Sequence, residues 1–359
     1  MNLRWTGGLP VIMLALCLSC RTSRTPSVAM LVQPQISAAH RPAAAMRSGA
    51  PAGGAPALAH IPLLSAEELK LYLPNEAGVV PILEYHAICR KETWMGRSIS
   101  NFKDDLERLY EEGYRPISLA DYLSNRIDLP AGMSPVVLTF DDARRSQFNY
   151  AAGGTLDPDC AVAILKDFAE SHPDFPLKAT FFVLPKCAFE QPDSAEQKLK
   201  ALVAWGCEIG NHTVTHRMLN RLSDEQVEKE IGGCASMLHR IVPDARVDMI
   251  AFPGGHSPRN HKLIAEGKFR GYHYSNAAGF LAASAPAPSP VAKHQDRLQI
   301  ERIVACEGDC GVTYWLDQIK KGNVRRYVSD GDPNTITVPR KFARLVDRNR
   351  LNGATLNLY

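Results

Sequence analysis

The sequence predicts an α/β fold, a distorted (β/α) barrel of about seven parallel strands surrounded by helices. Short apolar runs typical of buried strands alternate with segments of helical periodicity from residue 78 onward. About seven such β/α units fit within roughly 240 residues, which favours a closed or distorted barrel. An open parallel sheet is the alternative.

The expected strands are apolar runs, several of them rich in β-branched and aromatic residues and bounded by polar or Gly-containing turns. They are residues 78–86, 115–119, 136–140, 178–184, 207–210, 247–252 and 270–275.

The helices between them are predicted from periodicity and from start signals. Ser118 and Ser223 each begin a capping-box pattern, and Asp157-Pro158 is typical of an N-cap followed by a first turn. A helical stripe stops at Gly113, and a second follows Pro158. These stripes consist of Phe102, Leu106, Leu109 and Tyr110, and of Ala161, Ile164, Leu165 and Phe168.

The N-terminal part has the pattern of an exported protein. Arg4 precedes a short apolar run that ends at Ser19-Cys20, so residues 1–19 are expected to be a signal peptide. Cys20 is a candidate lipidation site, and a plain secretory signal is the alternative. We therefore expect a place in the periplasm or at the cell surface, with membrane attachment through an N-terminal lipid if Cys20 is modified.

Domain boundaries follow from composition. Residues 20–60 are rich in Ala, Pro, Ser and Gly and are expected to form a flexible linker. Residues 61–320 would form the main domain, and residues 321–359 a locally basic C-terminal extension, which is either a solvated face or a contact for an anionic cell wall. Residues 276–296 are Ala/Pro-rich and are expected to be a loop over the site.

Charge and cysteine usage narrow the classes of partner. The formal net charge of +3 is small and no basic block is interleaved with aromatic residues, so nucleic-acid binding is not expected. We expect a monomer. Nine cysteines suit an oxidising compartment. Cys306 and Cys310 are expected to form a local disulfide, and the odd number outside the signal region leaves at least one thiol unpaired within the chain.

Polar residues follow several of the expected strands. His86, Asp141, Asp142, His212 and Pro253 each come directly after an apolar run. The carboxyl ends of barrel strands meet at one face, where the functional groups of such folds collect. These residues are therefore expected to lie around one site.

His212 and His216 form an H-x-x-x-H pair that could bind one metal ion if the segment is helical. Thr213 stands where zinc proteases of the H-E-x-x-H type have their glutamate, so that class is excluded. A third ligand has to come from elsewhere, and a carboxylate oxygen of Asp141 or Asp142 is the natural candidate. Mixed nitrogen and oxygen ligands suit zinc, with cobalt or nickel as substitutes.

The segments "TFDD", "NHTVTH" and "AFPGG", in this order, resemble the first three motifs of the polysaccharide deacetylases, the NodB-homology group or carbohydrate esterase family 4. The resemblance covers about residues 79–305 and implies the NodB-type barrel. It implies that Asp142 binds the metal with His212 and His216, and that Asp141 is the general base. It also implies a substrate-binding surface, for which we select His86, Phe252, Pro253 and Gly254.

The sequence departs from the family pattern at three places. Ala143 replaces a usual glycine, and Ala251 lies where an arginine that orients the base is usual. The last motif, Leu-x-His, would supply the general acid, but "LQIERIVA" has Arg302 and no histidine. Arg302 is a candidate for orienting Asp141. His256 is the candidate acid, with His273 as a second choice.

The resemblance implies a metal-dependent hydrolase that removes N-acetyl groups from N-acetylglucosamine units of a bacterial polysaccharide and releases acetate. Exopolysaccharide and peptidoglycan are the main candidate substrates. An O-acetyl esterase acting on xylan uses the same chemistry. A non-catalytic carbohydrate-binding lipoprotein is the alternative from another class, motivated by the missing arginine and histidine.

Overall fold

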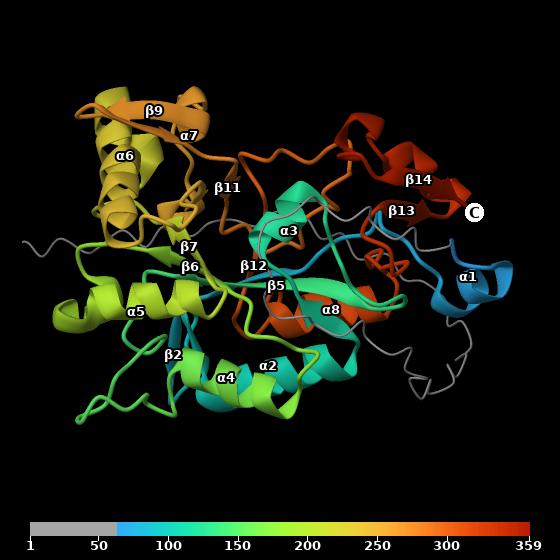
Figure 1. The fold of residues 1–359 in the computed structure, drawn as a ribbon, viewed down its shortest axis with the longest axis horizontal. Helices are drawn as coiled ribbons and strands as arrows, with labels where there is room; N and C mark the ends of the chain where they lie inside the picture. The colour runs from blue at the N-terminus through green and yellow to red at the C-terminus, as the bar shows by residue number, and fades with distance from the viewer. Residues whose placement is uncertain (1–62) are drawn as a thin grey trace, which may run out of the picture. The chain divides into compact units, whose positions relative to one another are not determined.

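The structure, a computed structural model, describes residues 63–359 (Figure 1). The expected signal peptide, Cys20 and the whole of the expected linker lie outside the described residues. Within residues 63–359, no helix has the length and apolar character needed to cross a membrane.

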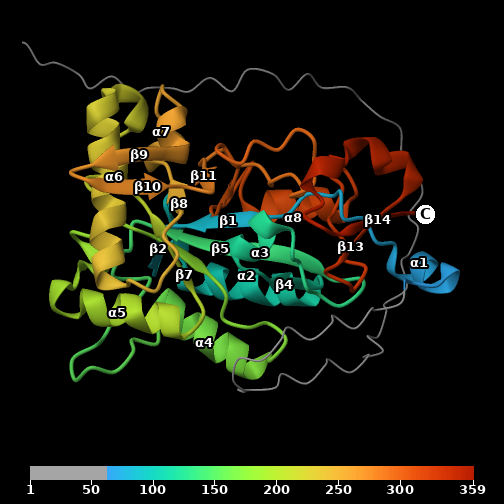
Figure 2. The ribbon, with the colours of Figure 1, turned by 45° about the horizontal axis from the view of Figure 1, so that its top comes forward.

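A parallel sheet of eight strands forms the centre of the described part (Figures 1 and 2). Its main path runs in the order β11-β8-β7-β6-β5-β1-β12, and β4 pairs with the first residues of β5. The strands are β1 (Ile82–Tyr85), β4 (Tyr114–Pro116), β5 (Ser134–Asp141), β6 (Thr180–Val183), β7 (Glu208–Asn211), β8 (Met249–Ala251), β11 (Ala278–Phe280) and β12 (Ile303–Val304).

The two ends of this path meet through residues 297–304. The backbone N–H of Ile300 donates to Gly279 O at 2.8 Å, and a parallel bridge joins Phe280 to Ile300. Three residues later, Ile303 pairs with Leu83 of β1. One short segment therefore contacts both edges of the sheet, and the prediction of a distorted parallel barrel is confirmed.

Helices cover the outer face of the sheet. In both ribbon views α2, α4 and α5 lie along the same side of β5 and β6 (Figures 1 and 2). The α-helices are α1 (Ala66–Tyr72), α2 (Ile99–Glu111), α3 (Leu119–Ser124), α4 (Ala161–Ser171), α5 (Pro192–Ala204), α6 (Asp224–Ile241), α7 (Lys262–Ala265) and α8 (Val312–Lys320). The 3₁₀ turns are η1 (Ala188–Glu190), η2 (Leu219–Arg221), η3 (Pro253–Gly255), η4 (Arg340–Leu345) and η5 (Arg348–Arg350).

Alternate residues of each central strand face two different hydrophobic clusters. In β5, Val136, Leu138 and Phe140 pack in the cluster that includes residues of α2 and α4, whereas Val137 packs in a second, inner cluster. Because strand side chains alternate, Thr139 and Asp141 point to the same side as Val137. Glu84 likewise shares a side with Ile82 of the inner cluster. The inner side therefore changes from apolar to polar toward the carboxyl ends of the strands.

The predicted helix starts are confirmed at two of three places. Ser118 and Ser223 both form complete capping boxes, with Asp121 and Gln226. The prediction at Asp157 is wrong, because α4 has Cys160 as its N-cap. The carboxylate of Asp157 instead accepts hydrogen bonds from Asp159 N and Asn149 Nδ2, so it stabilises the turn before the helix.

The expected strand at 270–275 exists but lies outside the barrel. β10 (Tyr272–Ser275) pairs antiparallel with β9 (Glu266–Phe269), and both pack on α6. Arg270 and Gly271 between them have positive φ, as a tight hairpin requires. The edge of the barrel is instead β11, which falls within residues 276–296. The expectation of a loop is therefore wrong for residues 278–280, although Ala282 and Ser284 do line the cleft described below.

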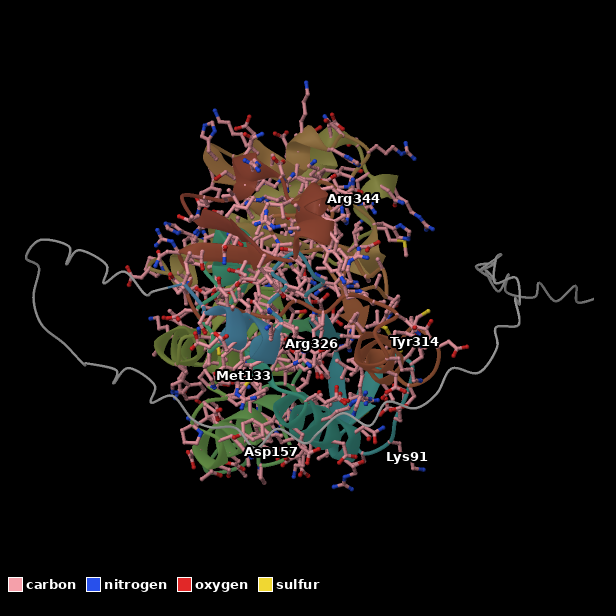
Figure 3. The ribbon with its side chains drawn as sticks, turned by 90° about the vertical axis from the view of Figure 1, so that its right-hand side faces the viewer. Lys91, Met133, Asp157, Tyr314, Arg326 and Arg344 are labelled. Atoms are coloured by element: carbon pink, nitrogen blue, oxygen red, sulfur yellow. The ribbon has the colours of Figure 1, made fainter. Side chains whose placement is uncertain are left out.

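Residues 321–359 pack against the start of the described chain. Bridges join Val328 to Asn75 and Arg326 to Val79, and β13 (Thr335–Val338) pairs with β14 (Thr355–Leu358). One of the basic residues in this extension is structural. The guanidinium of Arg326 lies 4.1 Å from the ring of Tyr114 and donates to Glu112 O. Figure 3 labels Arg326 near the middle of its view and Arg344 in the upper part.

Candidate active site

The turn after β5 places two adjacent aspartates at one site. The strand ends at Asp141, and the next two residues, Asp142 and Ala143, have φ of 75° and 51°. Left-handed backbone at non-glycine residues costs roughly 1–2 kcal/mol each. This reversal of the backbone after Asp141 frees the Asp142 carboxylate from the alternation of the strand, and the expectation that the strand ends here is confirmed.

Asp142, His212 and His216 converge at this turn. The Nε2 atoms of both histidines lie 3.3 Å from Asp142 Oδ1, and the two ring centroids are 4.9 Å apart. The helical segment considered for the histidine pair is absent. Residues 212–216 form a loop after β7 in which Thr213 and His216 have positive φ. The rings therefore converge through loop geometry.

These three side chains fit a divalent cation. His212 Nδ1 lies 2.9 Å from Ala251 O, which leaves Nε2 as the nitrogen that faces Asp142. Asp142 Oδ1 and His212 Nε2 are both buried and neither has a hydrogen-bond partner. Burial raises the pKa of Asp142, but the imidazoles of His212, His86 and His216 outweigh burial and hold it below its usual range. An ionised carboxylate and two imidazoles are a normal zinc ligand set.

Glu230 of α6 holds the loop between the two histidines. Its buried carboxylate accepts hydrogen bonds from Val214 N at 3.0 Å, Thr215 N at 2.8 Å and Thr215 Oγ1 at 2.6 Å. This bonding compensates the positive-φ backbone on either side, and it fixes the spacing of His212 and His216.

Replacing Glu230 with alanine is expected to weaken zinc binding by about 10-fold to 100-fold, the usual cost of losing a partner that orients the ligands. Isothermal titration of zinc into the apoprotein measures the effect. Glu225→Ala, an exposed position in the first turn of the same helix, is the matched control. Equal zinc affinity in the two variants would show that the loop keeps its shape without Glu230.

Arg302 binds the other aspartate, Asp141, through two hydrogen bonds. Its Nη1 and Nη2 donate to the two oxygens of Asp141, each at 2.7 Å, and Nη1 also donates to Thr139 Oγ1. The guanidinium is fully buried. Burial raises the pKa of Asp141, and the charge of Arg302 reverses this, so the carboxyl is ionised well below neutral pH. The structure thus places Arg302 where the sequence suggested a residue that orients Asp141.

Glu84 and His86 lie beside this pair. His86 Nε2 is 3.6 Å from Glu84 Oε1, and Arg302 Nη2 is 3.4 Å from Glu84 Oε2, which has no hydrogen-bond partner. Burial raises the pKa of Glu84 to about 8 and lowers the pKa of His86. Although Glu84, His86 and Asp141 could together approach a cation, Arg302 already supplies the positive charge there. Asp142 also has an arginine, Arg144, at 2.9 Å from its Oδ2, but its Oδ1 stays unpartnered beside the two imidazoles, so the set with Asp142 is the better metal site.

The raised pKa of Glu84 predicts a pH-dependent cost in stability. Below pH 4.5 the carboxyl is protonated in both folded and unfolded chains. Between 4.5 and about 8 only the unfolded chain releases the proton, so the free energy of unfolding falls by up to about 1.4 kcal/mol per pH unit. Glu84→Gln is expected to remove this slope, measured by urea unfolding at pH 5 and pH 8 with a chelator present. An equal change in the free energy of unfolding between pH 5 and pH 8 in the wild type and in Glu84→Gln would contradict the raised pKa of Glu84.

A cleft of about 710 Å³ opens above these groups. Of the residues predicted to bind substrate, His86, Phe252 and Gly254 line the cleft, and Pro253 is buried and does not line it. His256 and His273 are exposed and do not line the cleft, so the structure brings neither candidate acid to the site.

Cys306 and Cys310 are both free thiols, so the expected disulfide between them is absent from the structure. Cys306 also lines the cleft.

The sequence analysis missed two residues of the site. Glu84 is a charged residue within an apolar strand, "VVPILEYH", and a buried strand has no other reason to carry one. Glu230 occupies a helix position with no feature that separates it from ordinary surface glutamates. Only the strand position of Glu84 offered a signal.

Residues 129–275 match the family model described as polysaccharide deacetylase. YxkH of Bacillus subtilis strain 168, whose name gives it as a candidate polysaccharide deacetylase, is 24% identical over 240 residues, which cover 66% of this chain and 74% of that protein. A chitooligosaccharide deacetylase of Sinorhizobium fredii strain NGR234 is 30% identical over 135 residues, which cover 38% of this chain and about half (54%) of that protein.

Among solved structures, a candidate polysaccharide deacetylase from Bacillus anthracis superposes with a TM-score of 0.50 at 18% identity. The superposition covers 67% of this chain and 69% of that one. At this level of identity the likeness supports the fold alone, and it agrees with the curled parallel barrel described above.

Proposed function

We propose that the protein is a metal-dependent enzyme that releases acetate from N-acetylglucosamine units of a bacterial polysaccharide, on the premise that residues 129–275 match the polysaccharide deacetylase family model. The observation that carries the proposal is the pair of buried, unpartnered atoms Asp142 Oδ1 and His212 Nε2, which face each other beside a separate, arginine-bound aspartate. The proposed cation site and the proposed base are neighbours, an arrangement suited to hydrolysis of an amide.

Asp142, His212 and His216 would hold the cation, most simply zinc, with cobalt or nickel as substitutes. When bound, the cation polarises the acetyl carbonyl and lowers the pKa of the attacking water. Residues of this chain would carry out the proton transfers.

Asp141 is the proposed base. It lines the cleft, is ionised, and is fixed by the two hydrogen bonds from Arg302, so an oxygen of Asp141 can take the proton of the attacking water. Arg302 keeps the carboxylate in one orientation and lowers its basicity.

A proton must also reach the leaving nitrogen. Of the cleft histidines, His86 is the one outside the proposed metal set, and it lies 3.6 Å from the carboxyl of Glu84. We therefore place the donor role on His86 in place of His256. Because burial lowers the pKa of this imidazole, it has to take up a proton before it can donate one.

Acetate release from N-acetylglucosamine tetramers and hexamers tests the proposal. Release is expected to stop with a chelator and to return with zinc. Acetylated xylan oligomers form the second arm, and faster release from them would establish the esterase alternative. Binding of the oligomers without release in the presence of zinc, cobalt or nickel would establish the carbohydrate-binding alternative.

Export and lipidation are proposed from the sequence of residues 1–20. The substrate would then be met in the periplasm or at the cell surface. Mass spectrometry of the mature N-terminus, after globomycin treatment and without it, distinguishes a lipidated Cys20 from plain signal cleavage.

A further inference from the structure

Trp94 is the most exposed large hydrophobic side chain in the described part of the chain, at 80% exposure. It lies at the mouth of the cleft and contributes to its wall. Single exposed hydrophobic residues are common on protein surfaces. Trp94 differs from such residues because a rigid loop carries it and because carboxylates lie around it.

The loop that carries Trp94 is held rigidly between β2 (Ala87–Cys89) and β3 (Gly96–Ser98). Thr93 N donates to Gly96 O at 2.8 Å across the loop. The carboxylate of Glu92 accepts from Ser98 N, Asn101 Nδ2 and Arg97 Nη1. An indole held in water by a fixed loop loses little conformational entropy when a ligand packs on it.

Arg97 of β3 connects this loop to Glu307, another residue that lines the cleft. This guanidinium donates to both oxygens of Asp105, to Glu92 and to Glu307. Three carboxylates around one guanidinium leave two negative charges uncompensated. The Glu307 side chain is half exposed and lines the cleft, so part of this charge faces the ligand space.

One wall of the cleft is acidic. The lining of the cleft includes Glu84, Glu92, Asp141 and Glu307 and, within residues 63–359, no lysine or arginine. The two basic residues of the loop, Arg90 and Lys91, are exposed and outside the lining, and Figure 3 shows Lys91 at the outer edge of the molecule. On the floor, Glu84 has a pKa raised to about 8 and Asp141 is paired with Arg302, so the negative charge lies on the wall formed by Glu92 and Glu307. A cationic or neutral chain is thus favoured over an anionic one.

We propose that Trp94 and Glu307 form a subsite for an already deacetylated hexosamine unit of the polymer, with the sugar ring on the indole and its ammonium group near the carboxylate. The inference rests on the proposed function and narrows its substrate. It favours a hexosamine homopolymer that is partly deacetylated over peptidoglycan, whose lactyl and peptide carboxylates would meet the acidic wall. A cation over an indole face is a favourable contact.

Calorimetric binding of a glucosamine tetramer, which carries no acetyl group to release, tests the subsite. The wild-type protein is expected to bind it with an affinity that falls with salt. Trp94→Ala is expected to weaken binding by about 2-fold to 30-fold, and Glu307→Gln by up to about 5-fold. Trp94→Phe is expected to restore part of the loss. Glu266→Gln, which removes an exposed carboxylate on β9, is the charge-matched control and should bind as the wild type does.

Failure of the subsite and failure of the proposed function are distinguishable. Normal acetate release with tetramer binding that is absent, or equal in wild type, Trp94→Ala and Glu307→Gln, would overturn the subsite alone. Loss of tetramer binding in both variants of a protein that releases no acetate would support the subsite and overturn the catalytic proposal. A muramyl-peptide oligomer that binds as tightly as the glucosamine tetramer would also overturn the proposed selectivity.

Discussion

Replacing His212 with alanine is expected to remove both zinc binding and turnover. His212 is 1% exposed, its Nδ1 lies 2.9 Å from Ala251 O, and its Nε2 faces Asp142 Oδ1 at 3.3 Å. The loop that carries His212 is fixed by Asn211, whose Oδ1 accepts from Thr213 N. The loss of zinc affinity should exceed the 10-fold to 100-fold change expected at Glu230, since a ligand itself is removed.

Zinc titration and acetate release, measured on the same preparation, check this result. His239→Ala, an exposed histidine in the last turn of α6, is the matched control and is expected to bind zinc and to turn over normally. An unchanged zinc stoichiometry in His212→Ala would exclude this imidazole from the metal site.

Asp141→Asn is expected to separate the base from the metal site. The amide keeps the size of the side chain but cannot accept a proton at neutral pH, so the rate of acetate release should fall by about 10²-fold to 10⁴-fold. Zinc affinity should stay within a few fold of wild type, because Asp142 and the two histidines remain. The change in kcat should far exceed the change in KM.

Asp142→Asn is the comparison that makes this test sharp. It alters the neighbouring carboxylate by the same isosteric change, and here zinc affinity and turnover are expected to fall together. If Asp141→Asn lost zinc and Asp142→Asn kept it, the roles of the two aspartates would have to be exchanged.

The barrel and most of its elements were predictable because the signals are local. Strand 136–140 was evident from its apolar run, and the capping boxes at Ser118 and Ser223 were evident from residues three positions apart. The helix start at Asp157 was mispredicted because an aspartate before a proline has the same pattern whether it caps a helix or a turn. The prediction that residues 270–275 form a strand of the barrel was wrong, because their antiparallel pairing with residues 266–269 depends on packing against α6.

The site was predictable where motif residues carry it, and it was missed where the contacts are long-range. Asp142, His212 and His216 were expected together and do converge. The convergence depends on positive φ at Thr213 and His216. Positive φ is rare for a β-branched residue such as Thr213, so no propensity scale predicts it. The positions of His256 and His273 outside the cleft, and of Glu230 behind the loop, follow from tertiary packing.

Diffraction from crystals grown with zinc, recorded at the zinc absorption edge, tests the central claim most directly. The account predicts one strong anomalous peak shared by Asp142, His212 and His216, with Asp141 still held by Arg302. A peak between Glu84, His86 and Asp141, or none at the three expected ligands in a zinc-loaded, acetate-releasing protein, would contradict it.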